Sequence, residues 1–248
     1  MPIFDTHAYL EGYALPGINQ NTAQIQQFFQ ARQIDRALLF SARAAQVDPL
    51  SGNRILKVML EQAQGLYGCL VAHLNRVDAS LQAIRDLAPE RRFLGIMLTS
   101  TDPAEPLHPL VADEVLNACR RYQKPIFLNT PNAACVEVAL SLARAYSMHK
   151  FVFLRMGGAD WRTAIAAAQQ ATNVLLETSG TLDRSKIPAA VEAVGSHRIL
   201  FGSGMPALDP VAGLGLLHDS EVSRTDQRRI LHDNAAKLFN LHEIEEAA

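Results

Sequence analysis

The sequence predicts a single-domain α/β protein, a (β/α)8 TIM barrel, and three observations lead to this prediction. With 248 residues and a 48% hydrophobic composition, the chain is long enough to bury one sizeable core. Short apolar runs alternate with longer helical patterns along its whole length. The apolar runs lack polar alternation, which is typical of parallel strands that are covered on both faces.

The apolar runs are the candidate strands of this barrel. They comprise residues 3–4, 37–40, 68–72, 93–98, 125–128, 151–154, 174–176 and 199–201. Eight strands with helices between them favour a closed (β/α)8 barrel. An open doubly wound sheet is the main alternative, because alternation alone does not establish closure. The turn after the first strand, His7-Ala-Tyr-Leu-Glu-Gly12, contains no GxGxxG dinucleotide-binding pattern, which counts against the open sheet.

Helical patterns occupy the segments between the runs. In residues 22–33, the apolar side chains of Ile25, Phe28 and Phe29 fall on one face of a helix. Similar patterns cover residues 113–122, 133–146, 161–171 and 185–194. A final helix is expected to begin at Ser223-Arg-Thr-Asp226, which is similar to a capping box.

The composition limits the classes of function. The barrel is expected to span residues 1–241, with residues 242–248 as a frayed C-terminal tail. A net charge of −2 gives no electrostatic reason to expect nucleic-acid or membrane binding. No membrane span or signal peptide is visible, so a cytoplasmic location is expected. The cysteines, Cys69, Cys119 and Cys135, form no CxxC pair and are expected to be ordinary buried residues.

Candidate site residues follow from the fold, because the active site of such a barrel lies at the carboxyl ends of its strands. The residues at or just after these ends are Asp5, His7, Tyr9, Ser41, Arg43, His73, Asn75, Arg76, Met97, Thr99, Asn129, Arg155, Glu177, Ser179 and Ser203.

Several segments carry a resemblance to a known family. They are Phe4-Asp-Thr-His7-Ala-Tyr9, Phe93-Leu-Gly-Ile-Met97-Leu, Lys124-Pro-Ile-Phe-Leu-Asn129, Phe151-Val-Phe-Leu-Arg155-Met-Gly-Gly158, Asn173-Val-Leu-Leu-Glu177, Phe201-Gly-Ser-Gly204-Met-Pro206 and Arg229-Ile-Leu-His-Asp-Asn234. In this order and spacing, the chain resembles the amidohydrolase superfamily from Phe4 to Leu241, in particular its amidohydrolase-related branch of small-molecule hydrolases and decarboxylases.

The resemblance implies a metal site, and most of its ligands are replaced in this sequence. The family pattern places ligands in an Asp-x-His-x-His motif on the first strand, histidines after strands five and six, and an aspartate after strand eight. Here His7 remains, while Tyr9, Asn129, Arg155 and Gly204 stand at the other positions, and Met97 stands at the strand-four position. One imidazole is too few ligands for a divalent ion, and the Arg155 cation would repel it. No metal and no cofactor are therefore expected.

The remaining polar residues can act in catalysis or in structure. His7 could move protons while Asp5 orients it, or both could be packing residues of the strand end. Arg155 could bind a substrate carboxylate or phosphate, and it could also pair with Glu177 or Asp5. Glu177 is expected to be the partner of Arg155 rather than a general base.

Further polar residues are expected to bind the substrate. With Glu177, these are Tyr9, His73, Asn129 and Ser203. Ser203 lacks the Gly-x-Ser-x-Gly context of a nucleophile elbow, so it is not expected to act as a nucleophile. The catalytic residues are expected to be His7, Asp5 and Arg155.

Three functional hypotheses result. The first is a metal-free enzyme, of hydrolase or lyase type, that acts on a small carboxylated molecule such as a lactone or cyclic acid. The second is a non-catalytic descendant that binds a small anion or a protein partner. The third is an unusual metal site built from Asp5, His7, His73 and Glu177. A small-molecule anion is the expected partner, and an apolar surface could also form a homo-oligomer, although the sequence identifies none.

Overall fold

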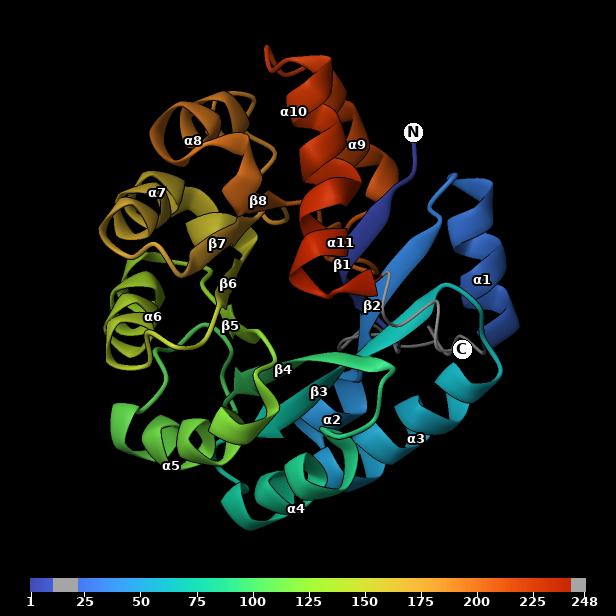
Figure 1. Ribbon diagram of the computed structural model, residues 1–248, viewed down its shortest axis with the longest axis vertical. Coiled ribbons are helices and arrows are strands. Elements are labelled where there is room, and N and C mark those ends of the chain that lie inside the picture. Colours follow the sequence, from blue (N-terminus) through green and yellow to red (C-terminus); the bar gives the residue numbers. More distant parts are fainter. Residues whose placement is uncertain (11–21, 242–248) are drawn as a thin grey trace.

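The strands of the computed structural model form a barrel, as predicted. The structure describes residues 1–10 and 22–241, and within them eight strands form one parallel sheet in the order β1 to β8 (Figure 1). The strands are β1 (Phe4–Tyr9), β2 (Arg36–Phe40), β3 (Leu66–His73), β4 (Phe93–Thr99), β5 (Ile126–Asn129), β6 (Phe151–Leu154), β7 (Val174–Glu177) and β8 (Ile199–Leu200). Each predicted apolar run therefore contains or overlaps a strand.

Backbone hydrogen bonds close the sheet between its first strand and the chain that follows β8. The Thr6 N–H donates to the Phe201 carbonyl over 2.9 Å, and the Gly204 N–H donates to the His7 carbonyl over 2.8 Å. The Tyr9 N–H donates to the Met205 carbonyl over 2.8 Å. These bonds confirm the barrel and exclude the open doubly wound sheet.

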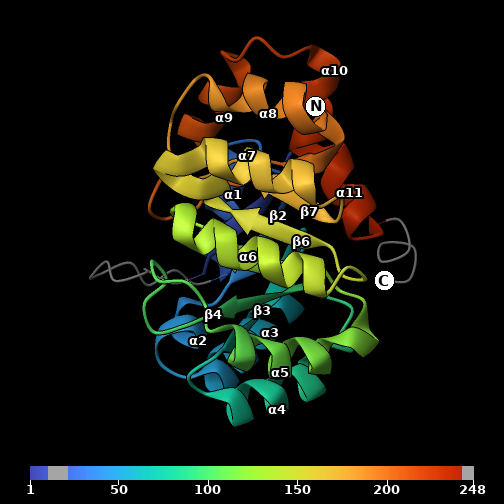
Figure 2. The ribbon, with the colours of Figure 1, turned by 90° about the vertical axis from the view of Figure 1, so that its left-hand side faces the viewer.

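Helices form a layer around the barrel, and Figure 2 shows α6 and α7 side by side over its strands. The helices of the described residues are α1 (Thr22–Ala31), α2 (Ala42–Gln46), α3 (Pro49–Glu61), α4 (Val77–Leu87), α5 (Pro109–Cys119), α6 (Ala133–Ala145), α7 (Trp161–Gln170), α8 (Lys186–Val194), α9 (Pro210–His218), α10 (Arg224–Arg228) and α11 (Asn234–Leu238). The five predicted internal helices are present with similar bounds. The predicted final helix is present as α10, a π-helical turn and α11. Ser223 caps its start, because its Oγ accepts a hydrogen bond from the Asp226 N–H over 3.1 Å.

The helices α2, α3, α4 and α9 lie in segments for which the sequence gives no helix bounds. In α3, Asn53 interrupts the apolar pattern, yet its side chain is fully buried. Its Nδ2 donates to the Val71 carbonyl over 2.8 Å and its Oδ1 accepts from the Val71 N–H over 2.9 Å. This pairing with β3 is a tertiary contact, which helical periodicity does not reveal.

The core has one layer inside the barrel and one between the strands and the helices. Inside the barrel, the Phe239 ring lies 5.5 Å from the Phe4 ring and 6.4 Å from the Phe127 ring. Because Phe239 directly follows α11, this last helix covers the amino end of the barrel. Cys69, Cys119 and Cys135 are free and buried, which confirms the prediction for the cysteines.

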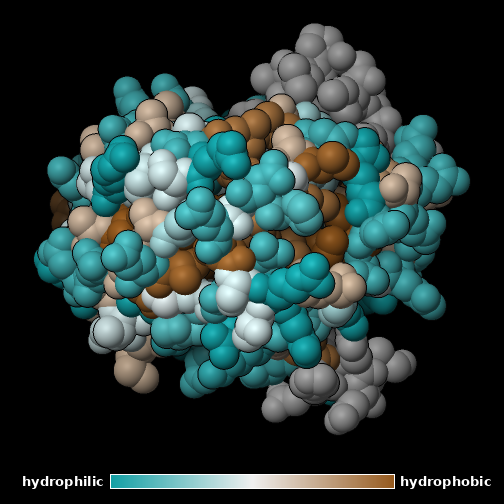
Figure 3. Space-filling view, turned by 90° about the horizontal axis from the view of Figure 1, so that it is seen from above, coloured by the Kyte–Doolittle hydropathy of each residue, from teal (hydrophilic) through white to brown (hydrophobic). Residues whose placement is uncertain are grey.

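The surface is mixed in polarity. Seen from above the view of Figure 1, hydrophilic residues cover most of the molecule and hydrophobic ones form small areas among them (Figure 3). Among the described helices, none has the length and apolar character needed to cross a membrane. The tail at residues 242–248, predicted to be frayed, lies outside the described residues.

Candidate functional site

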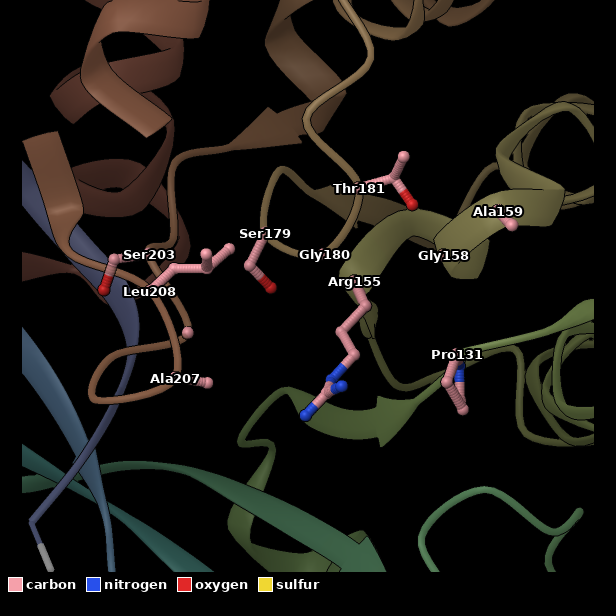
Figure 4. A pocket seen from close by; sticks show the side chains of 11 residues that line it. Pro131, Arg155, Gly158, Ala159, Ser179, Gly180, Thr181, Ser203, Ala207 and Leu208 are labelled. Atoms are coloured by element: carbon pink, nitrogen blue, oxygen red, sulfur yellow. The ribbon is translucent and has the colours of Figure 1, made fainter. Parts of the chain in front are cut away.

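A pocket of about 390 Å³ lies at the carboxyl ends of the strands β5 to β8 (Figure 4). The segments that follow these strands form its walls, and its polar side chains among the described residues are Arg155, Ser179, Thr181 and Ser203. This is the end of the barrel at which the sequence analysis placed the site.

Arg155 enters the pocket from a strained backbone segment. Its φ angle is +66°, and the next three residues also have positive φ angles. A left-handed conformation costs an arginine about 1 kcal/mol or more. Gly158 and Gly180 make the segment compact, since an added Cβ atom would lie 2.2 Å from the Pro131 carbonyl oxygen and 2.9 Å from the Arg155 carbonyl oxygen, respectively.

The Arg155 guanidinium has no ion-pair partner among the described residues. In Figure 4 it extends into the open space between Pro131 and Ala207. The backbone of Arg155, not its side chain, contacts Glu177: its N–H donates to Glu177 Oε2 over 3.0 Å. The predicted ion pair of Arg155 with Glu177 or Asp5 is therefore wrong, and the positive charge of Arg155 is available to a ligand.

Glu177 is the centre of a buried hydrogen-bond cluster. Its Oε1 accepts from the Ser179 N–H over 2.5 Å, and its Oε2 accepts from the Ser179 hydroxyl over 2.7 Å. His7 Nδ1 lies 3.1 Å from the same Oε2. Burial raises the pKa of Glu177, but the His7 charge and the hydrogen bonds outweigh this effect and the pKa lies below its ordinary value. Glu177 is therefore a carboxylate that stays ionised.

A glycine makes room for this carboxylate. A Cβ atom on Gly202 would lie 2.2 Å from Glu177 Oε1 and 2.8 Å from the His7 Cβ. Any larger residue at this position would therefore displace the Glu177 carboxylate or the His7 side chain.

His7 pairs with Glu177 through one ring nitrogen and leaves the other without a partner. Nδ1 also lies 3.1 Å from Ser179 Oγ, whereas the buried Nε2 has no hydrogen-bond partner. The rings of Tyr9 and Phe40 meet the imidazole edge-on, at 5.4 and 5.3 Å. An ionised Glu177 favours the proton on Nδ1, so we assign that tautomer. Nε2 then presents a lone pair that can accept a proton.

Asp5 does not orient the His7 ring, contrary to the prediction. Its Oδ1 accepts from the backbone N–H groups of His7 (3.1 Å) and Ser203 (2.9 Å), and its Oδ2 accepts from the Ser203 hydroxyl over 2.6 Å. Burial raises the pKa of Asp5 to about 6. Asp5 and Ser203 thus connect β1 to the chain after β8, while Glu177 takes the orienting role. Ser203 lines the pocket, but its hydroxyl is engaged with Asp5.

The structure does not bring Tyr9, His73 or Asn129 to the described walls of the pocket. The Asn129 side chain donates to the Pro103 carbonyl over 2.6 Å. His73 Nδ1 accepts from the Asn75 N–H over 3.1 Å, and burial, followed by the charge of Arg76, lowers the pKa of His73. The Tyr9 hydroxyl lies 4.0 Å from the Met97 sulfur. Their predicted roles in substrate binding therefore gain no support from this geometry.

Sequence reasoning missed the function of Lys186. This lysine is fully buried, and its Nζ donates to the carbonyls of Thr178 (2.6 Å) and Ser179 (3.1 Å). Burial lowers its pKa to about 8. Lys186 thus holds the turn that carries Ser179 into the pocket. No local sequence signal distinguishes it from a solvated lysine at the start of a helix.

The residues present do not fit the metal site that the family pattern implies. Among the residues described, no group of three or more His, Cys, Asp or Glu side chains could hold a metal ion. Asp5, His7, His73 and Glu177 form no such group, so the third hypothesis, an unusual metal site, is not supported there. Gly204 does face the site, since an added Cβ atom would lie 4.0 Å from His7 Nδ1.

Comparison with known proteins identifies the family. A closed barrel with a pocket at the carboxyl ends of its strands is the general architecture of (β/α)8 enzymes. The family model described as amidohydrolase matches residues 4–241, and the chain belongs to this family. No curated protein sequence matches the chain significantly.

Solved structures share the fold at low sequence identity. A 2,6-dihydroxybenzoate decarboxylase from Rhizobium is 15% identical, with a TM-score of 0.76 and coverage of 97% of this chain and 98% of its own. A dihydroxybenzoic acid decarboxylase from Polaromonas sp. JS666, with bound manganese, is 13% identical, with a TM-score of 0.77 and coverage of 97% of each chain. A probable 2-pyrone-4,6-dicarboxylic acid hydrolase from Acinetobacter baumannii, with citric acid bound, is 13% identical, with a TM-score of 0.68 and coverage of 97% of this chain and 100% of its own. At these identities, the likeness is one of fold.

Proposed function

We propose that this protein acts on a small carboxylated molecule, as a hydrolase or lyase, without the metal centre of its family. The observation that carries the proposal is the Arg155 guanidinium, which enters a 390 Å³ pocket without an ion-pair partner among the described residues. A guanidinium binds a carboxylate through two parallel hydrogen bonds.

Two further observations support a carboxylate ligand. The strained backbone at Arg155 lies beside glycines that leave no room for a Cβ atom, and strain of this kind concentrates at functional sites. The structures with the same fold include a complex with 2,6-dihydroxybenzoate and one with citric acid, both of which carry carboxyl groups. The pocket is within the size range of sites for such molecules.

Proton transfer in this proposal involves Ser179. The side chains of His7 and Glu177 are 1% and 0% exposed and are not among the described pocket walls, whereas Ser179 lines the pocket and contacts both. With its hydroxyl hydrogen directed at Glu177 Oε2, Ser179 Oγ can accept a proton from a ligand while its own proton passes to Glu177. The ligand then loses one proton, Glu177 gains one and Ser179 is unchanged, while His7 Nδ1 stays hydrogen-bonded to the same Glu177 oxygen.

A thermal-shift screen tests the anion site. Benzoate, 2,6-dihydroxybenzoate and citrate are compared with neutral benzamide, on the wild-type protein and on Arg155→Ala. We expect at least one carboxylate to raise the melting temperature, benzamide to have little effect, and Arg155→Ala to lose the shift. If no carboxylate stabilises the protein, or if Arg155→Ala responds equally, the proposal is wrong.

Metal analysis tests the metal-free part separately. Protein produced with added zinc and manganese is dialysed and analysed for bound metal. We expect far less than one ion per chain, because the described residues supply one imidazole where the family pattern has several ligands. Stoichiometric metal that a chelator removes together with activity would contradict this expectation.

A non-catalytic anion-binding protein is the second candidate function. The burial of His7 Nε2 favours it, because this lone pair cannot reach a ligand in the pocket directly. Turnover of a stabilising carboxylate by the wild-type protein, abolished in His7→Asn and Ser179→Ala while binding persists, would establish the enzyme. Binding without turnover of any carboxylate in the screen would favour the second candidate.

A further inference from the structure

A second pocket, of about 520 Å³, lies at the amino ends of the strands β6, β7 and β8. Lys150 precedes β6 and Thr172 precedes β7, while His197 and Arg198 precede β8. The remaining wall consists of Leu175 in β7, Val194 at the end of α8, and the helix α11. This pocket is therefore separate from the one that contains Arg155, which lies at the other end of the same strands.

The polar groups of this amino-end pocket are predominantly cationic. Lys150, Lys237, His197 and Arg198 line it, and no acidic side chain is among its described walls. Lys150, Lys237 and His197 are exposed and make no ion pair with any described residue. The whole chain has a net charge of −2, so this local excess of positive charge is not a property of the entire surface.

Arg198 gives the pocket a rigid positive charge. Its Nε donates to the Val174 carbonyl over 3.0 Å, and its Nη2 donates to the Ala168 and Ala171 carbonyls over 2.6 and 2.7 Å. No carboxylate pairs with this half-buried guanidinium, and its Nη1 has no hydrogen-bond partner among the described residues. One nitrogen of a fixed guanidinium thus remains available as a donor to an anion.

The floor of the pocket is apolar. Leu175 and Val194 are each 9% exposed, and the half-buried Leu238 lines the pocket with them. A ligand that only carried negative charge would leave this floor in contact with water. A ligand with an apolar body would cover this floor, and the burial of apolar surface favours binding.

We propose that the amino-end pocket binds a small amphipathic anion, with an acidic head beside Arg198, Lys150 and Lys237 and an apolar body on Leu175, Val194 and Leu238. The inference does not depend on the proposed function, because it concerns other residues at the opposite end of the barrel. Carboxylates and phosphates share the required head-group chemistry, and a comparison of acetate with inorganic phosphate distinguishes them.

Calorimetric titration tests the site with four probes: hexanoate, acetate, hexanamide and inorganic phosphate. The titrations use Arg155→Ala, so that the carboxyl-end pocket does not contribute. We expect hexanoate to bind about tenfold or more tightly than acetate or hexanamide, since only hexanoate combines the charge with an apolar body. If phosphate binds as tightly as hexanoate, the pocket binds anions without using its apolar floor. If hexanamide binds as tightly as hexanoate, the pocket binds apolar molecules without using its positive charge. Either result overturns the proposal.

Charge variants locate the site. In the same background, Lys150→Gln/Lys237→Gln should weaken hexanoate binding about tenfold, whereas the control pair Arg85→Gln/Arg224→Gln, which removes the same charge from exposed helix positions, should leave it unchanged. Hexanoate should also protect Lys150 and Lys237 from acetylation by acetic anhydride, with Lys57 unprotected. If both double variants lose hexanoate affinity equally, or if hexanoate protects neither Lys150 nor Lys237, the pocket does not bind the anion.

Discussion

The two ends of the strands β6, β7 and β8 carry the same type of charge in different ways. At the carboxyl end, the Arg155 side chain has no ion-pair partner among the described residues and extends into a pocket from a strained backbone. At the amino end, the Arg198 side chain is fixed by carbonyl groups of its own fold. The backbone conformation of Arg155 thus costs stability while its guanidinium stays without an ion-pair partner among the described residues. The hydrogen bonds of Arg198 instead stabilise the barrel.

The buried groups behind the two pockets also differ. Behind Arg155 lie ionisable side chains whose pKa values are shifted, namely Asp5, Glu177 and Lys186. Behind Arg198 lie apolar side chains and backbone carbonyls. The carboxyl-end pocket therefore lies against buried ionisable side chains, and the amino-end pocket lies against apolar side chains and backbone carbonyls.

The largest expected effect is at the centre of the carboxyl end. Glu177→Ala should lower the free energy of unfolding by about 3–5 kcal/mol, because it leaves the His7 ring and the N–H groups of Arg155 and Ser179 buried without their acceptor. Denaturant unfolding measures the loss, with the exposed Glu192→Ala as the control. A loss below about 1 kcal/mol would contradict the central position given to Glu177.

The pH dependence should also arise at the carboxyl end. Burial raises the pKa of Asp5 from 3.8 to about 6, so between these values the folded protein holds a proton that the unfolded chain has released. The bound proton contributes fully to the free energy of unfolding below pH 4, and this contribution is lost as the pH rises through 6. The loss is at most about 3 kcal/mol. Asp5→Asn should remove it, so its unfolding free energy should fall less than that of the wild type from pH 4 to pH 6. Parallel pH curves for the wild type, Asp5→Asn and the control Asp78→Asn would contradict the raised pKa.

Truncation of the two arginines should change the stability of the protein to different extents. Arg198→Met should cost about 2 kcal/mol or more, because the carbonyls of Ala168, Ala171 and Val174 lose a charged donor. Arg155→Met should change stability by less than about 0.5 kcal/mol, as at an ordinary surface position. Thermal unfolding of both variants makes the comparison, and equal losses would remove the distinction between the two ends.

The smallest expected effect is a gain in stability. Arg155→Gly should stabilise the protein by up to about 1 kcal/mol, because glycine adopts the φ angle of +66° without strain. The same variant should lose carboxylate binding. A destabilised Arg155→Gly that still binds carboxylates would show that Arg155 serves the fold rather than a ligand.

The sequence predicted the fold well, because apolar runs and their spacing determine strands locally. It also placed Arg155 in the pocket, since a residue directly after a barrel strand must lie at that end. The partners of Asp5 and Glu177 were predicted wrongly, because they depend on which strand ends meet across the closed barrel and on the space that Gly202 leaves. Lys186 and the amino-end pocket were missed for the same reason: their contacts join segments that share no local pattern.

Calorimetric titration of the chelator-treated protein tests the central claim most directly. The titrant is the carboxylate that gives the largest thermal shift. The account predicts binding without added metal, weakened at least about tenfold in Arg155→Ala and unchanged in the control Arg85→Gln/Arg224→Gln. Binding that requires added manganese, or that is equally tight in Arg155→Ala, would contradict it.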